Sequence, residues 1–163
     1  MPRPVVPGPG QESAWDYPRP PRVEPSPERV EVWLGGVRIA DTSRSVRVLE
    51  TSHPPTYYLP RDAFTEGSLV PAGGSTWCEW KGEATWFDVR GGRRTAPRAA
   101  WTYPAPRAGY ESLRGRVALM PGLVDRCVVD GETVLPQEGG FYGGWITSRV
   151  VGPFKGAPGT RGW

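Results

Sequence analysis

The residues best suited to chemistry in this chain lie in ETSHPP (residues 50–55) and WCEWKGEATW (residues 77–86). His53 is the only histidine, and an imidazole titrates near neutral pH, as a general acid or base should. The two prolines that follow it restrict the backbone, so His53 would lie on a rigid turn. The alternative is a polar turn residue that bonds a nearby carbonyl group.

Glu50 precedes His53 in the same stretch and is the second candidate for acid–base chemistry. In a strand, Val46, Val48 and Glu50 would share one face, because side chains alternate with a period of two. A carboxylate at the end of an apolar face could orient His53 or accept the proton itself. It could equally form a buried ion pair with one of the many arginines.

Lys81 is one of only two lysines among 20 basic residues, and it lies close to Cys78. In one continuous strand over residues 77–86, Cys78 would face the core and Lys81 would point to solvent with Glu79 and Glu83. If Lys81-Gly82 instead forms a turn or bulge, as glycine permits, Lys81 and Cys78 converge on one site. Lys81 would then activate the thiolate or anchor a carboxylate or phosphate. A buried, inert Cys78 is the alternative.

Aromatic residues accompany these groups. Trp101 and Tyr103 are two residues apart, so they share a face if they lie in a strand. They would either help to wall a cleft for a planar ligand or pack in the core. The six aromatic candidates for such a cleft are Tyr57, Tyr58, Trp80, Trp86, Trp101 and Tyr103. The aromatic–Lys–Gly arrangement recurs at Lys155, in a tail loop that is either plain surface or a cover over the pocket.

Composition excludes several other functions. Two cysteines 49 residues apart and one histidine cannot supply the roughly four ligands of a structural zinc site, so no metal and no cofactor is expected. The net charge of +3 is spread over dispersed arginines, without the cluster that nucleic-acid binding requires. No segment has the run of about 18 apolar residues that a membrane span needs. We therefore expect a cytoplasmic protein without nucleic-acid or membrane partners, and the sequence does not define its oligomeric state.

The chain divides into three segments. Residues 1–28 contain nine prolines and are expected to form an extended arm, in which Trp15 and Tyr17 could dock on the domain. Residues 29–136 are expected to form the β domain, and residues 137–163, which are rich in glycine and aromatic residues, an extension that packs on it.

Short β patterns separated by glycine and proline turns predict a mainly β fold for the domain. We expect a compact sandwich or partly open barrel of about eight short strands. Tight hairpins are predicted at Gly35-Gly36 and at Asp130-Gly131. One or two short helices are predicted, a single turn at 61–64 and about two turns near 108–114.

Three stretches of the chain resemble domain-of-unknown-function family 427: VLETSHPPTYYLPRDAF, TWCEWKGEATWFDV and AAWTYPAP. The resemblance covers about residues 29–136 and implies a compact fold of the Mss4-like or β-tent type. Related members bind zinc through paired CxxC motifs, which this chain lacks. The family also carries a nucleotidyltransferase-like label, but the chain has neither a P-loop nor a Gly-Ser followed by paired aspartates. Leu119-Met120 stands where many members carry an aromatic pair, so this wall of a pocket would differ.

Three hypotheses for the function follow. The first is a small-molecule-binding domain, in which the aromatic cleft holds a planar ligand and Lys81 anchors its anionic group. The second is an enzyme without a redox cofactor, hydrolytic, isomerising or cyclising, in which Glu50 and His53 act as acid and base. The third is an interaction scaffold that uses the proline-rich arm and the aromatic tail. The sequence identifies neither a ligand nor a reaction.

Overall fold

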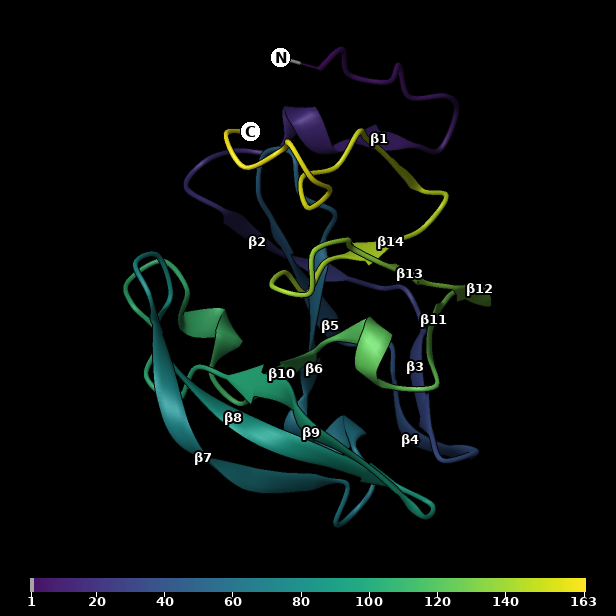
Figure 1. The fold of residues 1–163 in the computed structure, drawn as a ribbon, viewed down its shortest axis with the longest axis vertical. Coiled ribbons are helices and arrows are strands. Elements are labelled where there is room, and N and C mark those ends of the chain that lie inside the picture. The colour runs from purple at the N-terminus through teal and green to yellow at the C-terminus, as the bar shows by residue number, and fades with distance from the viewer. Residues whose placement is uncertain (1) are drawn as a thin grey trace.

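The structure is a computed structural model that describes residues 2–163. Two antiparallel sheets form its body, a seven-stranded sheet and a four-stranded sheet (Figure 1). Both sheets are open, and none of the described strands closes a barrel. The prediction of a mainly β, sandwich-like fold is therefore confirmed. No helix among the described residues has the length and apolar character to cross a membrane.

The seven-stranded sheet has the order β2-β5-β6-β10-β9-β8-β7. Its strands are, in chain order, β2 (Arg22–Ser26), β5 (Ser45–Leu49), β6 (Thr56–Pro60), β7 (Leu69–Cys78), β8 (Gly82–Gly91), β9 (Arg94–Thr102) and β10 (Arg116–Leu119). Strands β7, β8 and β9 have 10, 10 and 9 residues and are longer than the short strands expected from the sequence. They form two consecutive hairpins at one edge of the sheet.

The four-stranded sheet has the order β12-β11-β3-β4. Its strands are β3 (Val30–Leu34), β4 (Val37–Thr42), β11 (Arg126–Val129) and β12 (Glu132–Thr133). Both predicted hairpins lie in this sheet and are confirmed. Gly35 and Gly36 have φ of 63° and 76°, and Asp130 and Gly131 have φ of 47° and 80°, as a tight two-residue turn with both φ positive requires.

The remaining elements are short. Two further strand pairs are β1 (Glu12–Ser13) with β15 (Val150–Val151), and β13 (Leu135–Pro136) with β14 (Trp145–Ile146). The helical turns are the 3-10 segments η1 (Ala14–Asp16), η2 (Arg61–Ala63), η3 (Glu111–Leu113) and η4 (Pro121–Leu123). The turn predicted at 61–64 is confirmed as η2. The two-turn helix near 108–114 is wrong, because Gly109 and Gly115 take positive φ at either end and leave only η3.

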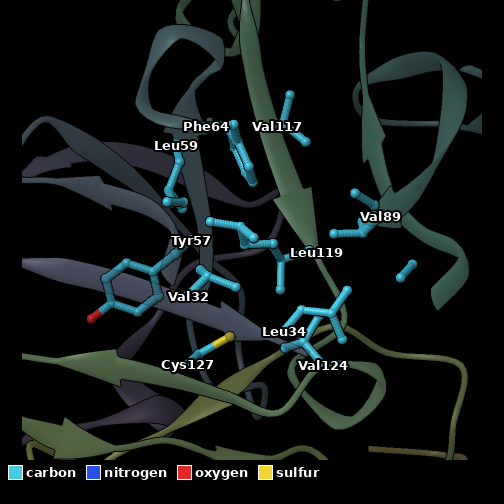
Figure 2. Close-up of a cluster of buried hydrophobic side chains, with 14 of the residues drawn as sticks. Val32, Leu34, Tyr57, Leu59, Phe64, Val89, Val117, Leu119, Val124 and Cys127 are labelled. Atoms are coloured by element: carbon cyan, nitrogen blue, oxygen red, sulfur yellow. The ribbon is translucent and has the colours of Figure 1, made fainter. Parts of the chain in front are cut away.

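A layer of mainly aliphatic side chains, which we call the aliphatic layer although it also contains a few aromatic rings, fills the space between the two main sheets (Figure 2). Val32 and Leu34 of β3 meet Leu59 of β6 and Leu119 of β10 there, all fully buried. Cys127 of β11 lies in the same layer, and burial raises the pKa of its thiol. Cys127 is therefore the small buried hydrophobe that a lone cysteine suggests.

The opposite face of the seven-stranded sheet carries a second cluster, which we call the aromatic face. It is formed by side chains from β5, β6, β8, β9, β10, η3 and the connection between β9 and η3: Val46, Val48, Tyr58, Ala84, Trp101, Tyr103, Tyr110, Leu113 and Ala118. Val46 and Val48 share this face, as the period of two predicts. The central strands β5, β6 and β10 are thus buried on both faces, one against the second sheet and the other under aromatic residues, whereas most of β7 is exposed.

The two ends of the chain pack together on β5. Strand β1 pairs with β15, which brings the N-terminal and C-terminal segments side by side (Figure 1). Tyr17 and Val150 are buried against Leu49, and the buried Arg47 forms ion pairs with Glu12 and with Glu24 of β2. Residues 1–28 were expected to form an extended arm. They instead supply β2, an edge strand of the seven-stranded sheet, and β1, which pairs with β15 of the C-terminal segment.

Gly35 provides a test of how the two sheets meet. A Cβ atom on Gly35 would lie 2.0 Å from the carbonyl oxygen of Gly91, whereas one on Gly36 would meet nothing within 4 Å. Both residues have positive φ, so alanine costs about 1–2 kcal/mol at either position for backbone strain alone. We expect Gly35→Ala to cost more than about 4 kcal/mol, because it also displaces backbone. Urea unfolding of the two variants measures the difference, and equal losses would contradict this packing.

Candidate functional site

A cavity of about 630 Å³ opens on the aromatic face. Nine of the ten residues that the sequence singled out for catalysis or ligand binding line it, and Tyr57 is the exception. These residues are Glu50, His53, Tyr58, Cys78, Trp80, Lys81, Trp86, Trp101 and Tyr103. Gln137, Tyr142 and Lys155 line it as well, from the C-terminal segment.

Tyr57 lies on the wrong side of the sheet for this cavity. It is adjacent to Tyr58 in β6, so the two side chains point to opposite faces. The Tyr57 ring is buried between the sheets, 4.9 Å from the ring of Trp145. Its hydroxyl group, which points away from the aliphatic cluster in Figure 2, donates a hydrogen bond of 2.7 Å to Glu28. The prediction that Tyr57 contributes to the ligand site is therefore wrong.

Leu119 is also separated from the cavity, by the same alternation. It belongs to the aliphatic layer between the sheets, whereas its neighbour Met120 lines the cavity. Of the Leu119-Met120 pair, which was expected to form one wall of the pocket, only Met120 lines the cavity.

The stretch that contains Lys81 is a hairpin and not a continuous strand. Strand β7 ends at Cys78, β8 begins at Gly82, and these two residues pair across the ladder. Gly82 has φ of 108°, a backbone conformation that favours glycine. The backbone N–H of Arg107 donates to the carbonyl oxygen of Lys81 at 2.9 Å, which holds the turn in place. The continuous-strand interpretation is therefore wrong and the turn interpretation is confirmed.

This turn brings the Lys81 side chain back over Cys78. Lys81 Nζ lies 3.6 Å from Cys78 Sγ and 5.9 Å from the centre of the Tyr103 ring. The ammonium group is thus held above an aromatic ring at the cavity wall, where a cation–π contact favours a positive charge. Lys81 and Cys78 converge on one site, as the turn interpretation predicts.

Glu50 and His53 are brought together by a tight turn directly after β5. The backbone N–H of His53 donates to the Glu50 carbonyl oxygen at 3.0 Å. Between them, Ser52 is buried with φ of 69°, a conformation that L-residues rarely adopt outside turns. Glu50 Oε2 then lies 3.6 Å from His53 Nε2 and 3.5 Å from Arg19 Nε. Glu50 thus lies beside both His53 and an arginine, but its ion pair with Arg19 is partly exposed and not the buried pair considered as the alternative.

Sequence reasoning missed Gln137. Its buried carboxamide group makes three contacts: Nε2 lies 3.2 Å from His53 Nδ1 and donates to the Lys155 carbonyl oxygen at 2.7 Å, and Oε1 accepts from the Gly144 N–H at 3.1 Å. A polar residue at the start of a glycine-rich tail carries no pattern that distinguishes it from a surface residue. Only the folding of the tail over ETSHPP identifies it.

The tail forms the roof of the cavity. Residues 137–144 connect β13 to β14, and Trp145 anchors them because it is fully buried and donates from Nε1 to the Leu119 carbonyl oxygen at 3.2 Å. Tyr142 packs edge-on against His53, with ring centres 5.0 Å apart, and Lys155 Nζ lies 5.7 Å from the centre of the Tyr142 ring. Lys155 is thus part of the cover of the pocket and not a plain surface residue.

The walls of the cavity are aromatic. The rings of Trp86 and Trp101 lie 5.3 Å apart, and Trp101 Nε1 donates to the Tyr58 hydroxyl at 3.2 Å. Burial raises the pKa of Tyr58 and of Tyr103, so both phenols remain protonated and uncharged. Trp77 and Phe141 also line the cavity, yet their side chains are mostly exposed, which leaves an apolar rim at its mouth.

Charge in the cavity is predominantly positive. Lys81, Lys155 and Arg98 line it, and among the residues that the structure describes, Glu50 is the only acidic side chain that does so. Both lysines and the single histidine of the chain, His53, therefore line the same cavity. Within residues 2–163, no group of three or more His, Cys, Asp or Glu side chains is placed to hold a metal ion.

His53 is neutral in this environment. Burial lowers the pKa of its imidazole, Lys155, Arg19 and Lys81 lower it further, and Glu50 opposes them. Proton uptake by His53 in the folded protein therefore requires a pH below the ordinary value of 6.5.

This shift predicts an acid-sensitive stability. Below pH 6.5 the unfolded chain binds a proton at His53 while the folded chain does not, so the free energy of unfolding falls as the pH falls. We expect urea denaturation to show this loss between about pH 7.5 and pH 5, above the range in which carboxylates titrate. His53→Gln should remove the slope over this interval. A variant that keeps the full slope would assign it to other groups.

Comparison with known proteins places the site within a family. The chain matches the family model described as a domain of unknown function (DUF427) over residues 22–130. No curated protein matches the chain. The matched segment contains Glu50, His53, Cys78 and Lys81, whereas Gln137 and the other tail residues of the cavity lie beyond it. The chain therefore belongs to the DUF427 family of domains of unknown function.

Proposed function

We propose that this protein binds a small anionic molecule with a planar or aromatic part in the cavity on the aromatic face. The observation that carries the proposal is the gathering of both lysines of the chain around one aromatic-walled space. A concave, mostly apolar space of this volume with a few convergent polar groups is typical of a small-molecule site.

The charges support an anionic ligand. Arg19 already lies 3.5 Å from Glu50 and offsets its negative charge, so Lys81 and Lys155 remain without a carboxylate partner in the described residues. A carboxylate or phosphate in the cavity would supply the negative charge that these two ammonium groups lack. The ammonium groups of Lys81 and Lys155 can each donate strong, charge-assisted hydrogen bonds to a carboxylate or phosphate.

The walls support a planar ligand. Trp86 and Trp101 offer ring faces and edges, and neighbouring aromatic side chains favour offset or edge-on packing of a further ring. Burial of an aromatic group against such walls adds to the affinity that the lysines supply.

Aromatic acids test the proposal, with indole-3-carboxylate and phenyl phosphate as probes and indole-3-carboxamide as the neutral isostere. We expect tryptophan fluorescence to respond to the acids and the carboxamide to bind at least about tenfold more weakly, because it lacks the charge. Lys81→Met should weaken binding of the acids by about 10- to 100-fold.

Arg93→Gln is the matched control for this experiment. It also removes one positive charge, but from an exposed turn outside the cavity. Binding that is lost equally in both variants would reflect net charge alone. Acids that bind Lys81→Met as tightly as the wild type would contradict an anion site at Lys81.

The second candidate is a cofactor-independent enzyme with Glu50 and His53 as acid–base groups. The observation in its favour is the turn at Ser52, where a positive φ in a buried, non-glycine residue holds the two side chains 3.6 Å apart beside the cavity. A strained backbone at such a position is common at functional sites.

Two variants distinguish catalysis from binding. Glu50→Gln and His53→Gln should each reduce turnover of a substrate by about 100-fold or more if these groups transfer protons. Turnover that survives both changes would overturn the enzymatic function. Binding of indole-3-carboxylate that persists in His53→Gln but disappears in Lys81→Met would favour a ligand-binding domain.

A further inference from the structure

We infer that Gln137 of the C-terminal tail is a positioning residue that holds His53 as the neutral tautomer with its proton on Nε2. His53 then presents an N–H donor to the cavity. Of Glu50 and His53, only Glu50 can then accept a proton. This goes beyond the proposed function, because it assigns the proton positions of a pair that the sequence treats as interchangeable acid and base.

The orientation of the Gln137 carboxamide is determined by two backbone groups. The Gly144 N–H needs an acceptor, so Oε1 must face it, and the Lys155 carbonyl oxygen needs a donor, so Nε2 must face it. Reversing the amide would set donor against donor and acceptor against acceptor at a buried site. Each such mismatch costs about 1–3 kcal/mol, so the reversed orientation is strongly disfavoured.

The surroundings also leave the carboxamide little room to rotate. A Cβ atom on Gly144 would lie 2.4 Å from Gln137 Oε1, and one on Gly156 would lie 3.3 Å from Gln137 Cγ. Gly144 lets the tail close tightly around the Gln137 carboxamide and Pro54, whereas at Gly156 the closest atom to an added Cβ would be the carbonyl oxygen of Glu138, at 2.2 Å. The glycine-rich composition of the tail thus has a structural reason at these two residues.

The second N–H of Gln137 Nε2 points to His53 Nδ1 at 3.2 Å. An amide nitrogen only donates, so His53 Nδ1 must accept and carries no proton. In the neutral ring the proton is then on Nε2, the nitrogen that lies 3.6 Å from Glu50 Oε2. An imidazolium ion would set an Nδ1–H against the amide N–H, which disfavours protonation of His53.

The other charged and titratable groups around His53 act in the same direction, with one exception. Arg19, Lys81 and Lys155 disfavour a positive ring, and Tyr142 packs its ring against it. Only Glu50 favours the charged imidazole, and it is itself paired with Arg19. His53 is therefore kept neutral both by the surrounding charges and by the hydrogen-bond geometry at Gln137.

This assignment has a consequence for recognition, which rests on the proposed function. The atom of a ligand that meets His53 Nε2–H must be an acceptor, which a carboxylate or phosphate oxygen supplies. In the enzymatic alternative, Glu50 takes the proton and His53 donates a hydrogen bond to developing negative charge.

Nitrogen NMR of the ligand-free protein tests the inference. Because the chain has one histidine, a long-range ¹H–¹⁵N correlation spectrum contains one imidazole pattern. At about pH 7.5, above the ordinary imidazole pKa, we expect Nδ1 to show the chemical shift of an unprotonated nitrogen and Nε2 that of a protonated one. The opposite tautomer, or an imidazolium ion at this pH, would overturn the inference without any variant.

Gln137→Glu tests the causal role of the amide. A carboxylate at this position would accept from Nδ1–H, so we expect the pKa of His53 to rise by about one unit or more. Gln11→Glu is the matched control, because Gln11 is the only other glutamine and is exposed, far along the chain from His53. An equal change in both variants would refute a specific role for Gln137. Binding of indole-3-carboxylate is measured separately, so failure of the proposed ligand leaves the tautomer result standing.

Discussion

The central strands of the seven-stranded sheet, β5, β6 and β10, are buried on both faces, and the rest of the structure depends on this constraint. Successive side chains of a strand point to opposite faces, so a strand buried in this way must supply two different surfaces. In β6, Tyr57 enters the aliphatic layer and Tyr58 the aromatic face. In β9, Ala100 and Trp101 divide in the same way. One face is closed by the second sheet, and the other is only partly closed, which leaves the cavity.

The candidate site residues lie where the strands of this sheet are interrupted by turns. Glu50 and His53 occupy the turn after β5, and Lys81 occupies the turn between β7 and β8. A residue within a strand that is buried on both faces must pack against its neighbours. A residue in a turn is free of this constraint and can place a charged group beside a packed face. The tail then covers these turns, and Gln137 connects it to His53.

A buried polar arrangement of this kind defines chemistry through hydrogen bonding as much as through charge. Both N–H groups of the Gln137 carboxamide donate hydrogen bonds, one to the Lys155 carbonyl oxygen and one to His53 Nδ1. Because Nδ1 accepts this bond, the proton of His53 resides on Nε2. The two lysines, by contrast, meet aromatic rings, and within residues 2–163 neither forms an ion pair with a carboxylate. The cavity therefore combines the hydrogen-bonded carboxamide of Gln137 on one wall with the positive charge of the two lysines on others.

Local signals in the sequence determined the mainly β class, the two glycine hairpins and the candidates Glu50, His53, Cys78 and Lys81, because turns and alternation depend on neighbouring residues. Only the tertiary structure decided that Lys81 lies over Cys78, that Tyr57 faces away from the cavity and that Gln137 and Lys155 complete it. Those relations depend on which face each strand presents and on contacts such as that of Gln137 with His53, which lie 84 residues apart in the chain. No local pattern encodes such a contact, because it forms only when the tail folds back over the sheet.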